Sequence, residues 1–280
     1  MIQDIGEHTF DNQYHPCPPD RESYALYYED HAALVRKYPD RIEFPKFRDI
    51  ERLNEDIYED AVYLFSIDGE RYYLVEEINR ERQSHFTMEN TEIFRYAEPQ
   101  YLAFAGITGY QLHNWYQSRR FCGKCGRGKE KNSKGKITDM YCESCHNMEF
   151  PKICPAVIIG VTDGDKILMS KYAGRTYKKY ALLAGFTEIG ETLEETVQRE
   201  VMEEVGLKVK NIRYYKSQPW SFTDTLLMGF YCDLDGGAAI TLDREELAMA
   251  EWFQRDEIPV EPERDSITNE MIIRFKNGEV

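Results

Sequence analysis

The stretch Gly185-Phe-Thr-Glu-Ile-Gly-Glu-Thr-Leu-Glu-Glu-Thr-Val-Gln-Arg-Glu-Val-Met-Glu-Glu-Val-Gly-Leu207 decides the fold of the C-terminal half of the chain. A helix from Thr192 to Val205 would align apolar side chains at i, i+4 spacing along one face: Leu193, Val197, Val201 and Val205. Strand-like runs, Ala156 to Val161 and Lys166 to Ser170, precede this helix, and further strands follow it. The pattern therefore predicts an α/β arrangement in which the helix packs its apolar face against a sheet.

Two glutamates lie beside the apolar face of this predicted helix. At about 100° per residue, Glu200 and Glu204 fall within roughly 20° of the leucine that starts the ladder. Carboxylates one turn apart repel each other and lose hydration beside apolar residues, a cost that cations offset. Hard divalent ions such as Mg2+ or Mn2+ prefer these oxygen ligands. A solvated acidic face is the alternative, and it explains Glu194, Glu195 and Glu203 but not the placement of the first pair.

The same stretch resembles the Nudix box, G-x5-E-x7-R-E-U-x-E-E-x-G-U with U aliphatic, and every specified position is met. The resemblance implies hydrolysis of a nucleoside diphosphate that is linked to another group. It also implies a catalytic Mg2+ or Mn2+ that is bound by three carboxylates and one backbone carbonyl: those of Glu200, Glu203 and Glu204, and that of Ala184. Glu191 and Arg199 would brace the loop against the helix.

A second motif, Ser217-Gln-Pro-Trp-Ser-Phe-Thr-Asp-Thr225, narrows the substrate. It resembles S-Q-P-W-P-F-P-x-S, the signature of the NADH pyrophosphatase group of Nudix hydrolases. The resemblance implies a substrate-binding segment made of Gln218, Pro219, Trp220, Ser221, Phe222, Thr223, Asp224 and Thr225. Ser221 and Thr223 stand where the signature has prolines, which loosens a segment that prolines would hold extended. Core packing is the alternative interpretation of Trp220 and Phe222, although Trp and Gln together offer a heterocycle a stacking face and an amide.

Two more aromatic residues are implicated by the same family pattern. Phe186 follows the first glycine of the box, and Phe150 precedes the proline that closes the cysteine-rich segment. In the family the side chains at both positions face the base of the bound dinucleotide. Phe150 would reach the site of a partner subunit, so the resemblance implies a homodimer.

One position departs from the family. The pattern E-[IL]-x-[ED]-A-x-W expects an acidic metal ligand where this chain has Met249. Either Glu245, Glu246 or Glu251 substitutes from a neighbouring position, or fewer metals are bound and turnover is slower.

Four of the seven cysteines form two pairs, Cys122-x2-Cys125 and Cys142-x2-Cys145, with sixteen residues between the pairs. Two such knuckles close a tetrathiolate site that suits zinc. Because the intervening polar segment has little apolar area to offset its conformational entropy, we predict one structural zinc per chain. Four unligated cysteines are one alternative. Another is a ribbon that grips RNA through its basic residues: Lys124, Arg127, Lys129, Lys131, Lys134 and Lys136.

These patterns divide the chain into an N-terminal domain (1–114), a zinc ribbon (115–150) and a Nudix domain (151–280). Two aromatic and aliphatic runs between Ala61 and Val75 flank Asp68-Gly69, which predicts a hairpin. The pattern from Tyr101 to Arg120 is helical and ends where the cysteines begin. The predicted fold class is α+β: a C-terminal Nudix α/β/α sandwich with a mixed sheet, a four-cysteine zinc ribbon, and an N-terminal β-rich α+β domain.

The balance of charge limits the partners of the protein. The 280 residues include 50 Asp and Glu against 35 Lys and Arg, a formal net charge of -15 that argues against strong binding to a nucleic-acid backbone. The first residues, MIQDIGEHTF, lack the basic start and apolar core of a signal peptide, and no run of about 18 apolar residues occurs. We therefore expect no membrane insertion. The few cysteines favour a reducing cytoplasm over a disulfide scaffold.

Together these features predict a metal-dependent enzyme that cuts the diphosphate of NADH or NAD+ to give nicotinamide mononucleotide and AMP. One alternative is a broader hydrolase that acts on ADP-ribose or other nucleoside diphosphate derivatives. Another is removal of NAD caps from RNA, in which the ribbon and its lysines would guide the strand. A catalytically inactive binding module is supported only by Met249, because the box itself is intact.

Overall fold

The computed structural model describes residues 1–280 apart from positions 14, 16, 55, 80–84, 129–140 and 175–177. The described chain forms two compact units. The N-terminal unit comprises Ile2–Lys152 and Ser221–Thr223, and the C-terminal unit comprises Met1, Ile153–Trp220 and Asp224–Val280. None of the helices in this part of the chain combines the length and the apolarity needed to cross a membrane.

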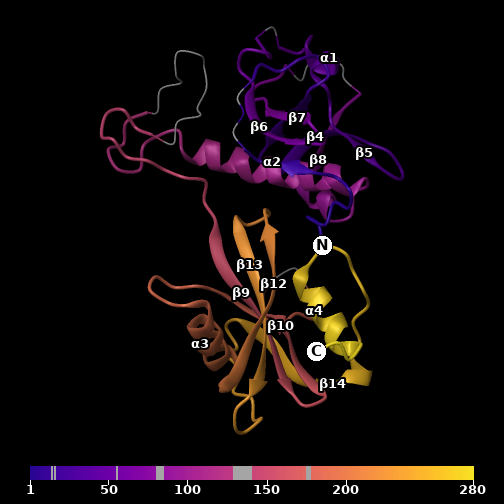
Figure 1. Cartoon of the computed structure of the whole chain (residues 1–280), viewed down its shortest axis with the longest axis vertical. Coiled ribbons are helices and arrows are strands. Elements are labelled where there is room, and N and C mark those ends of the chain that lie inside the picture. Colours follow the sequence, from indigo (N-terminus) through magenta and orange to yellow (C-terminus); the bar gives the residue numbers. More distant parts are fainter. Residues whose placement is uncertain (14, 16, 55, 80–84, 129–140, 175–177) are drawn as a thin grey trace. The chain divides into compact units, whose positions relative to one another are not determined.

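The C-terminal unit is built on a mixed six-stranded sheet (Figure 1). Its strands are β9 (Cys154–Asp163), β10 (Lys166–Tyr172), β11 (Leu183–Phe186), β12 (Val209–Trp220), β13 (Thr225–Leu234) and β14 (Leu247–Gln254). The strand order is β12-β13-β9-β10-β14, and β11 also pairs with β9. Strands β13 and β9 are parallel, whereas the other pairs are antiparallel. The predicted strands around Asp163-Gly164 are confirmed as the hairpin of β9 and β10.

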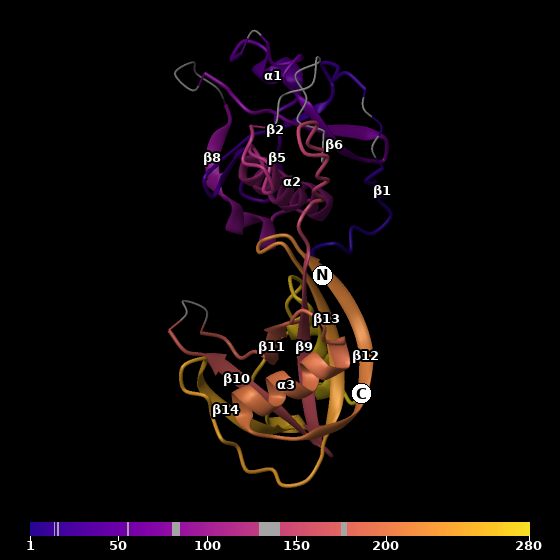
Figure 2. The ribbon, with the colours of Figure 1, turned by 90° about the vertical axis from the view of Figure 1, so that its left-hand side faces the viewer.

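One helix covers each face of this sheet, so the predicted α/β/α sandwich is confirmed. Helix α3 (Leu193–Val205) lies across one face (Figure 2), where its buried valines join a core with strand residues such as Ile159 and Phe230. Helix α4 (Ile267–Lys276) packs on the other face, where Met271 and Phe275 join a second core. A short 3-10 turn, η2 (Arg255–Glu257), follows β14.

The ends of α3 follow from its sequence. The Thr192 hydroxyl accepts a hydrogen bond from the Glu195 N–H, and the Glu195 carboxylate accepts one from the Thr192 N–H at 2.8 Å. This capping box satisfies two of the N–H groups that a helix start leaves without partners. Gly206 ends the helix at φ 68°, a left-handed conformation that glycine adopts without strain. The helix predicted from Thr192 to Val205 is thus confirmed.

The N-terminal unit has two small sheets and one long helix. One sheet contains β1 (Phe10–Asp11), β6 (Val62–Ile67), β7 (Glu70–Leu74) and β2 (Tyr24–Leu26), and the other contains β3 (Tyr28–Glu29), β4 (Ala32–Lys37), β5 (Ile42–Glu43) and β8 (Thr87–Asn90). The helical elements are α1 (Phe47–Ile50), η1 (Thr91–Arg95) and α2 (Gln100–Ser118). Buried residues of α2 share a core with both sheets. This is the β-rich α+β arrangement that the sequence predicts.

The hairpin predicted at Asp68-Gly69 is confirmed. Ile67 of β6 pairs with Glu70 of β7, and both turn residues have positive φ, 53° and 78°. Such a two-residue turn matches the twist of its strands. Helix α2 continues through residue 114 to Ser118, so the predicted boundary at 114 lies inside a helix; the division into three domains stays a prediction.

Candidate active site and cysteine cluster

Strand β11 and helix α3 approach each other closely at Gly185. This residue pairs with Val157 of β9, and a Cβ added to it would lie 1.9 Å from the carboxyl carbon of Glu200. Only glycine leaves room for that carboxylate. The first glycine of the box therefore creates the space in which Glu200 lies.

We expect Gly185→Ala to displace the Glu200 carboxylate and to lower the free energy of unfolding by about 1–3 kcal/mol, the usual cost of overpacking. Denaturant titration measures this loss. Gly237→Ala is the matched control, because a Cβ at that glycine meets nothing within 4 Å. Equal stability of the two variants would show that the close approach does not constrain the carboxylate.

Arg199 connects the loop of the box to the acidic residues of α3. Its guanidinium donates hydrogen bonds to Glu191 at 2.6 and 2.9 Å, to Glu200 at 2.7 Å and to Glu203 at 2.9 Å. It also donates one at 2.9 Å to the backbone carbonyl of Phe186. The two bonds from Arg199 to Glu191 lower the pKa of that carboxyl to about 2, together with hydrogen bonds from the Glu188 N–H and the Thr196 hydroxyl. Arg199 and Glu191 thus lie as the box predicts, between loop and helix.

The carboxylates of α3 differ in exposure. Glu204 is 2% exposed and Glu200 is 8% exposed, whereas Glu203 faces solvent. Burial raises the pKa of Glu200, and Arg199 opposes this effect, while the charges of Glu203 and Glu246 add to it. Among the described residues the oxygens of Glu200, Glu203 and Glu204 do not form a ligand set as compact as that of the four cysteines. A buried carboxylate nevertheless favours a cation as its partner. Ala184, the residue before Gly185 on β11, packs its side chain against the core beneath α4.

The pairing of β14 shows on which face of the sheet Met249 and its acidic neighbours lie. Trp252 packs in the core beneath α3, and Phe253 packs in the core beneath α4. Because side chains alternate along a strand, Met249 and Glu251 lie on the α4 face, away from α3. Glu246, which precedes β14, is close enough for its charge to act on Glu200.

The predicted substrate segment runs from the end of β12 into the start of β13, and its residues differ in environment. Ser221 and Thr225 are buried; Trp220, Phe222 and Asp224 are half-buried; Pro219 and Thr223 are exposed. The Phe222 ring lies 4.5 Å from the guanidinium carbon of Arg95 within the N-terminal unit. The side chains of the segment therefore do not all lie on one exposed surface.

The environment of the Gln218 side chain differs from the one that the sequence predicts. Its side chain is fully buried, donates a hydrogen bond to the Asp265 carbonyl at 2.9 Å, and accepts one from the Ile267 N–H at 2.7 Å. Ile267 is the first residue of α4, so the amide satisfies an N–H that the helix start leaves without an intrahelical partner. The expectation that this amide faces a base does not agree with these bonds, and we assign Gln218 a structural role.

The two aromatic residues implicated outside this segment are both open to solvent. Phe186 is 56% exposed and Phe150 is 64% exposed. Neither ring is part of a core, so each is accessible to a planar ligand.

The four predicted cysteines come together. The Sγ atoms of Cys122 and Cys145 are 3.6 Å apart, those of Cys125 and Cys142 are 3.7 Å apart, and all four lie within 4.8 Å of one another. They are placed to hold a metal ion. Backbone N–H groups of Cys125 and Lys124 lower the pKa of Cys122 to about 6, whereas burial raises the pKa of Cys145 to about 12.

The two knuckles have the same backbone pattern. In the first, the Cys122 N–H donates to the Arg127 carbonyl at 2.8 Å; in the second, the Cys142 N–H donates to the Asn147 carbonyl at 2.7 Å. Lys129, Lys131, Lys134 and Lys136, four of the basic residues on which the alternative of an RNA-binding ribbon depends, lie outside the described residues.

Comparison with known proteins identifies the C-terminal region. Residues 152–275 match the model of the NUDIX domain. The chain is 34% identical over 212 residues to the NAD-capped RNA hydrolase NudC of Mannheimia succiniciproducens, a match that covers 74% of this chain and 78% of that protein. It is 40% identical over 164 residues to the NAD-capped RNA hydrolase NudC of Photorhabdus laumondii, which covers 59% of this chain and 63% of that protein.

A solved structure is also similar to part of this chain. The crystal structure of a NUDIX hydrolase from Nitrosomonas europaea has a TM-score of 0.48 and 24% identity, with 56% of this chain and 90% of that chain covered. The NudC proteins of Photorhabdus laumondii and Erwinia tasmaniensis are matched over 63% and 62% of their length, somewhat less than two thirds. Given the domain match and the 34% identity across 78% of a relative, the chain belongs to the Nudix hydrolase family.

Proposed function

We propose that the protein hydrolyses the diphosphate bond of NADH and NAD+ to nicotinamide mononucleotide and AMP. The observation that carries this proposal is the arrangement of buried Glu200 and Glu204 on α3, with Glu200 beside Gly185 and tied to Arg199. The motif from Ser217 to Thr225, and relatives that are named NAD-capped RNA hydrolases, support a nicotinamide dinucleotide as substrate.

The donor set suits a hard divalent cation, Mg2+ or Mn2+. Glu200, Glu203 and Glu204, with the carbonyl of Ala184, are the residues that we propose to hold it. When bound, such an ion neutralises the diphosphate oxygens and lowers the pKa of water. Arg199 orients Glu200 and Glu203 through its hydrogen bonds. Glu203 faces solvent, so it can accept the proton of the attacking water.

We propose that Glu246 replaces the family acid that is missing at Met249, because its charge acts on Glu200 whereas Met249 lies on the α4 face. Glu246→Gln should raise the Mn2+ concentration for half-maximal activity at least about tenfold, and Met249→Glu should change it little. Glu251→Gln, on the α4 face, is the control. The reverse pattern, in which only Met249→Glu alters metal dependence, would assign the role to position 249.

We propose that the base stacks on the exposed rings of Phe186 and, from the partner subunit of a homodimer, Phe150, and on the half-buried ring of Trp220. Mixing tests the shared site: Phe150→Ala and Glu204→Gln subunits, each inactive alone, should regain activity when exchanged into mixed dimers. Each mixed dimer would contain one site with both residues intact. A fully active monomer at assay concentration, measured by light scattering, would count against the dimer.

We propose that the cysteine cluster holds one zinc ion. Tetrahedral zinc with bonds of about 2.3 Å to sulfur requires sulfur-to-sulfur distances of roughly 3.8 Å. The 3.6 and 3.7 Å separations across the cluster agree with that geometry. A thiolate zinc site also suits the reducing cytoplasm that we predict.

One assay tests the substrate. Purified protein is given NADH, NAD+, ADP-ribose or NAD-capped RNA, each with and without added Mn2+, and the products are separated by chromatography. We expect Mn2+-dependent release of nicotinamide mononucleotide from NADH and NAD+. The names of the relatives favour NAD-capped RNA as a second substrate. Faster hydrolysis of ADP-ribose than of either dinucleotide would replace the proposal with that of a broader hydrolase.

A further inference from the structure

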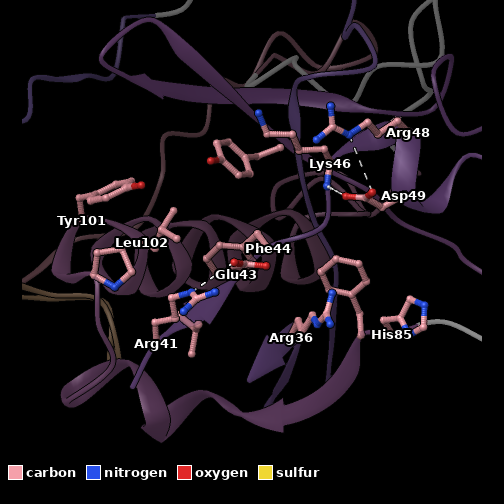
Figure 3. Close-up of a pocket in the computed structure, with 14 residues that line it drawn as sticks. Arg36, Arg41, Glu43, Phe44, Lys46, Arg48, Asp49, His85, Tyr101 and Leu102 are labelled. Carbon is pink, nitrogen blue, oxygen red and sulfur yellow. Dashed lines mark hydrogen bonds and ion pairs between the residues drawn. The ribbon is translucent and has the colours of Figure 1, made fainter. Parts of the chain in front are cut away.

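The N-terminal unit contains a cavity of about 590 Å3 that the Nudix box does not use (Figure 3). Its lining comes from β2, β4, β5, residues His85 and Phe86, the segment into α1, and the start of α2, all within that unit. The volume lies in the range of about 300–1000 Å3 that is typical of small-molecule sites.

The lining is cationic although the chain is acidic. Four side chains carry positive charge, Arg36, Arg41, Lys46 and Arg48, and two carry negative charge, Glu43 and Asp49. The cavity therefore has a positive formal charge in a protein whose net charge is -15. A concentration of one sign of charge in a concave site attracts ligands of the opposite sign.

The two acidic groups are already engaged by neighbouring residues. The Asp49 carboxylate accepts the Lys46 backbone N–H at 2.9 Å, which caps α1 (dashed in Figure 3). Glu43 accepts hydrogen bonds from the Tyr38 hydroxyl at 2.9 Å and from Arg41 at 3.3 Å. Three of the four cations are paired as well, Lys46 and Arg48 with Glu22 and Arg41 with Glu43, so the positive charge of the lining that is unpaired within the described residues comes from Arg36.

Arg36 is the cation that is most available to a ligand. Its guanidinium lies 4.9 Å from the centre of the Tyr38 ring, and it makes no ion pair with any residue that the structure describes. The side chain is exposed at the end of β4. A planar guanidinium that is not paired with a carboxylate matches the geometry of a phosphate group.

Aromatic side chains line the same cavity. Phe86 and Tyr101 are half-buried, and Tyr101 has His8 beside one part of its ring at 4.2 Å between centroids. Tyr24 is stacked on Tyr72 and has Lys46 over its ring, and Phe44 is buried. Aromatic faces next to guanidinium groups suit a ligand that has both a planar ring and an anion. Sugar phosphates and simple carboxylates lack the ring.

We propose that this cavity binds a free nucleoside phosphate, with the phosphate at Arg36 and Arg41 and the base against the aromatic rings. The cavity is sized for a small molecule, and the net charge of -15 disfavours a long polyanion, so a mononucleotide is preferred over an RNA strand.

Calorimetric titration of the full-length protein with 5′-AMP, without added Mg2+ or Mn2+, tests the proposal. Arg36→Gln should weaken binding at least about tenfold, because it removes a charge-assisted contact to phosphate. Lys37→Gln is the matched control: it removes the same charge from the next position on β4, which is not part of the lining, and it should leave affinity within about twofold. Adenosine should bind at least about tenfold more weakly than 5′-AMP.

Equal affinity of the two variants for 5′-AMP, or absence of binding by the unaltered protein, would overturn the proposal. So would binding of a single-stranded oligonucleotide without binding of mononucleotides, since this result would identify an RNA surface instead. Arg36→Lys, which keeps the charge but loses the planar fork, provides a second test if Arg36→Gln fails to fold, and it should also bind 5′-AMP more weakly.

Discussion

Glu204→Gln is expected to lower the rate of dinucleotide hydrolysis by at least about a hundredfold while leaving the fold intact. Glutamine has nearly the shape of glutamate, so the substitution removes charge from a side chain that is 2% exposed without creating a cavity. Without that charge, the proposed cation is held less tightly beside Glu200. Initial rates at saturating and at limiting Mg2+, with circular dichroism as the check on folding, measure the effect.

Glu194→Gln is the matched control for this prediction. Glu194 lies in the first turn of the same helix and is exposed, so its loss should change the rate less than about twofold. An unchanged rate in Glu204→Gln at both Mg2+ concentrations would exclude α3 from the reaction and leave the Nudix resemblance as one of fold only.

Cys142→Ser is expected to unfold the ribbon or to aggregate the protein, and a strong chelator should have the same effect. Structural zinc contributes on the order of 10 kcal/mol to folding, which a small polar segment cannot replace by burial of apolar groups. Cys142 is one of two buried cysteines in the cluster. Thermal unfolding, combined with measurement of bound zinc, checks the prediction.

Cys154→Ser makes the same chemical change outside the cluster, on β9, and should have a much smaller effect on unfolding. A Cys142→Ser protein that folds fully, holds no zinc and keeps its activity would show that the cluster does not need a metal.

The features that the sequence predicted best depend on regular spacing. The apolar ladder of α3 and the two cysteine pairs each impose a local geometry that needs no knowledge of the rest of the chain. For the same reason the Asp68-Gly69 turn could be predicted from two residues and their flanking strands.

The features that the sequence could not predict depend on long-range packing. The face on which Met249 lies is set by the pairing of β14 with β10, which no local pattern reveals. The electrostatic effect of Glu246 on Glu200 joins residues far apart in the sequence. The basic cavity was also missed, because its cations come from separate strands and turns and form no motif along the chain.

The fully buried amide of Gln218 bears on how the S-Q-P-W type of signature is interpreted. Both of its polar atoms are bonded to the start of α4, so a change here would disturb the anchoring of a helix before it altered any ligand contact. A signature that classifies enzymes by substrate can therefore contain two kinds of information, one about chemistry and one about architecture. In this chain, loss of the glutamine would diagnose a changed scaffold, whereas only changes at its more exposed neighbours would diagnose a changed preference for substrate.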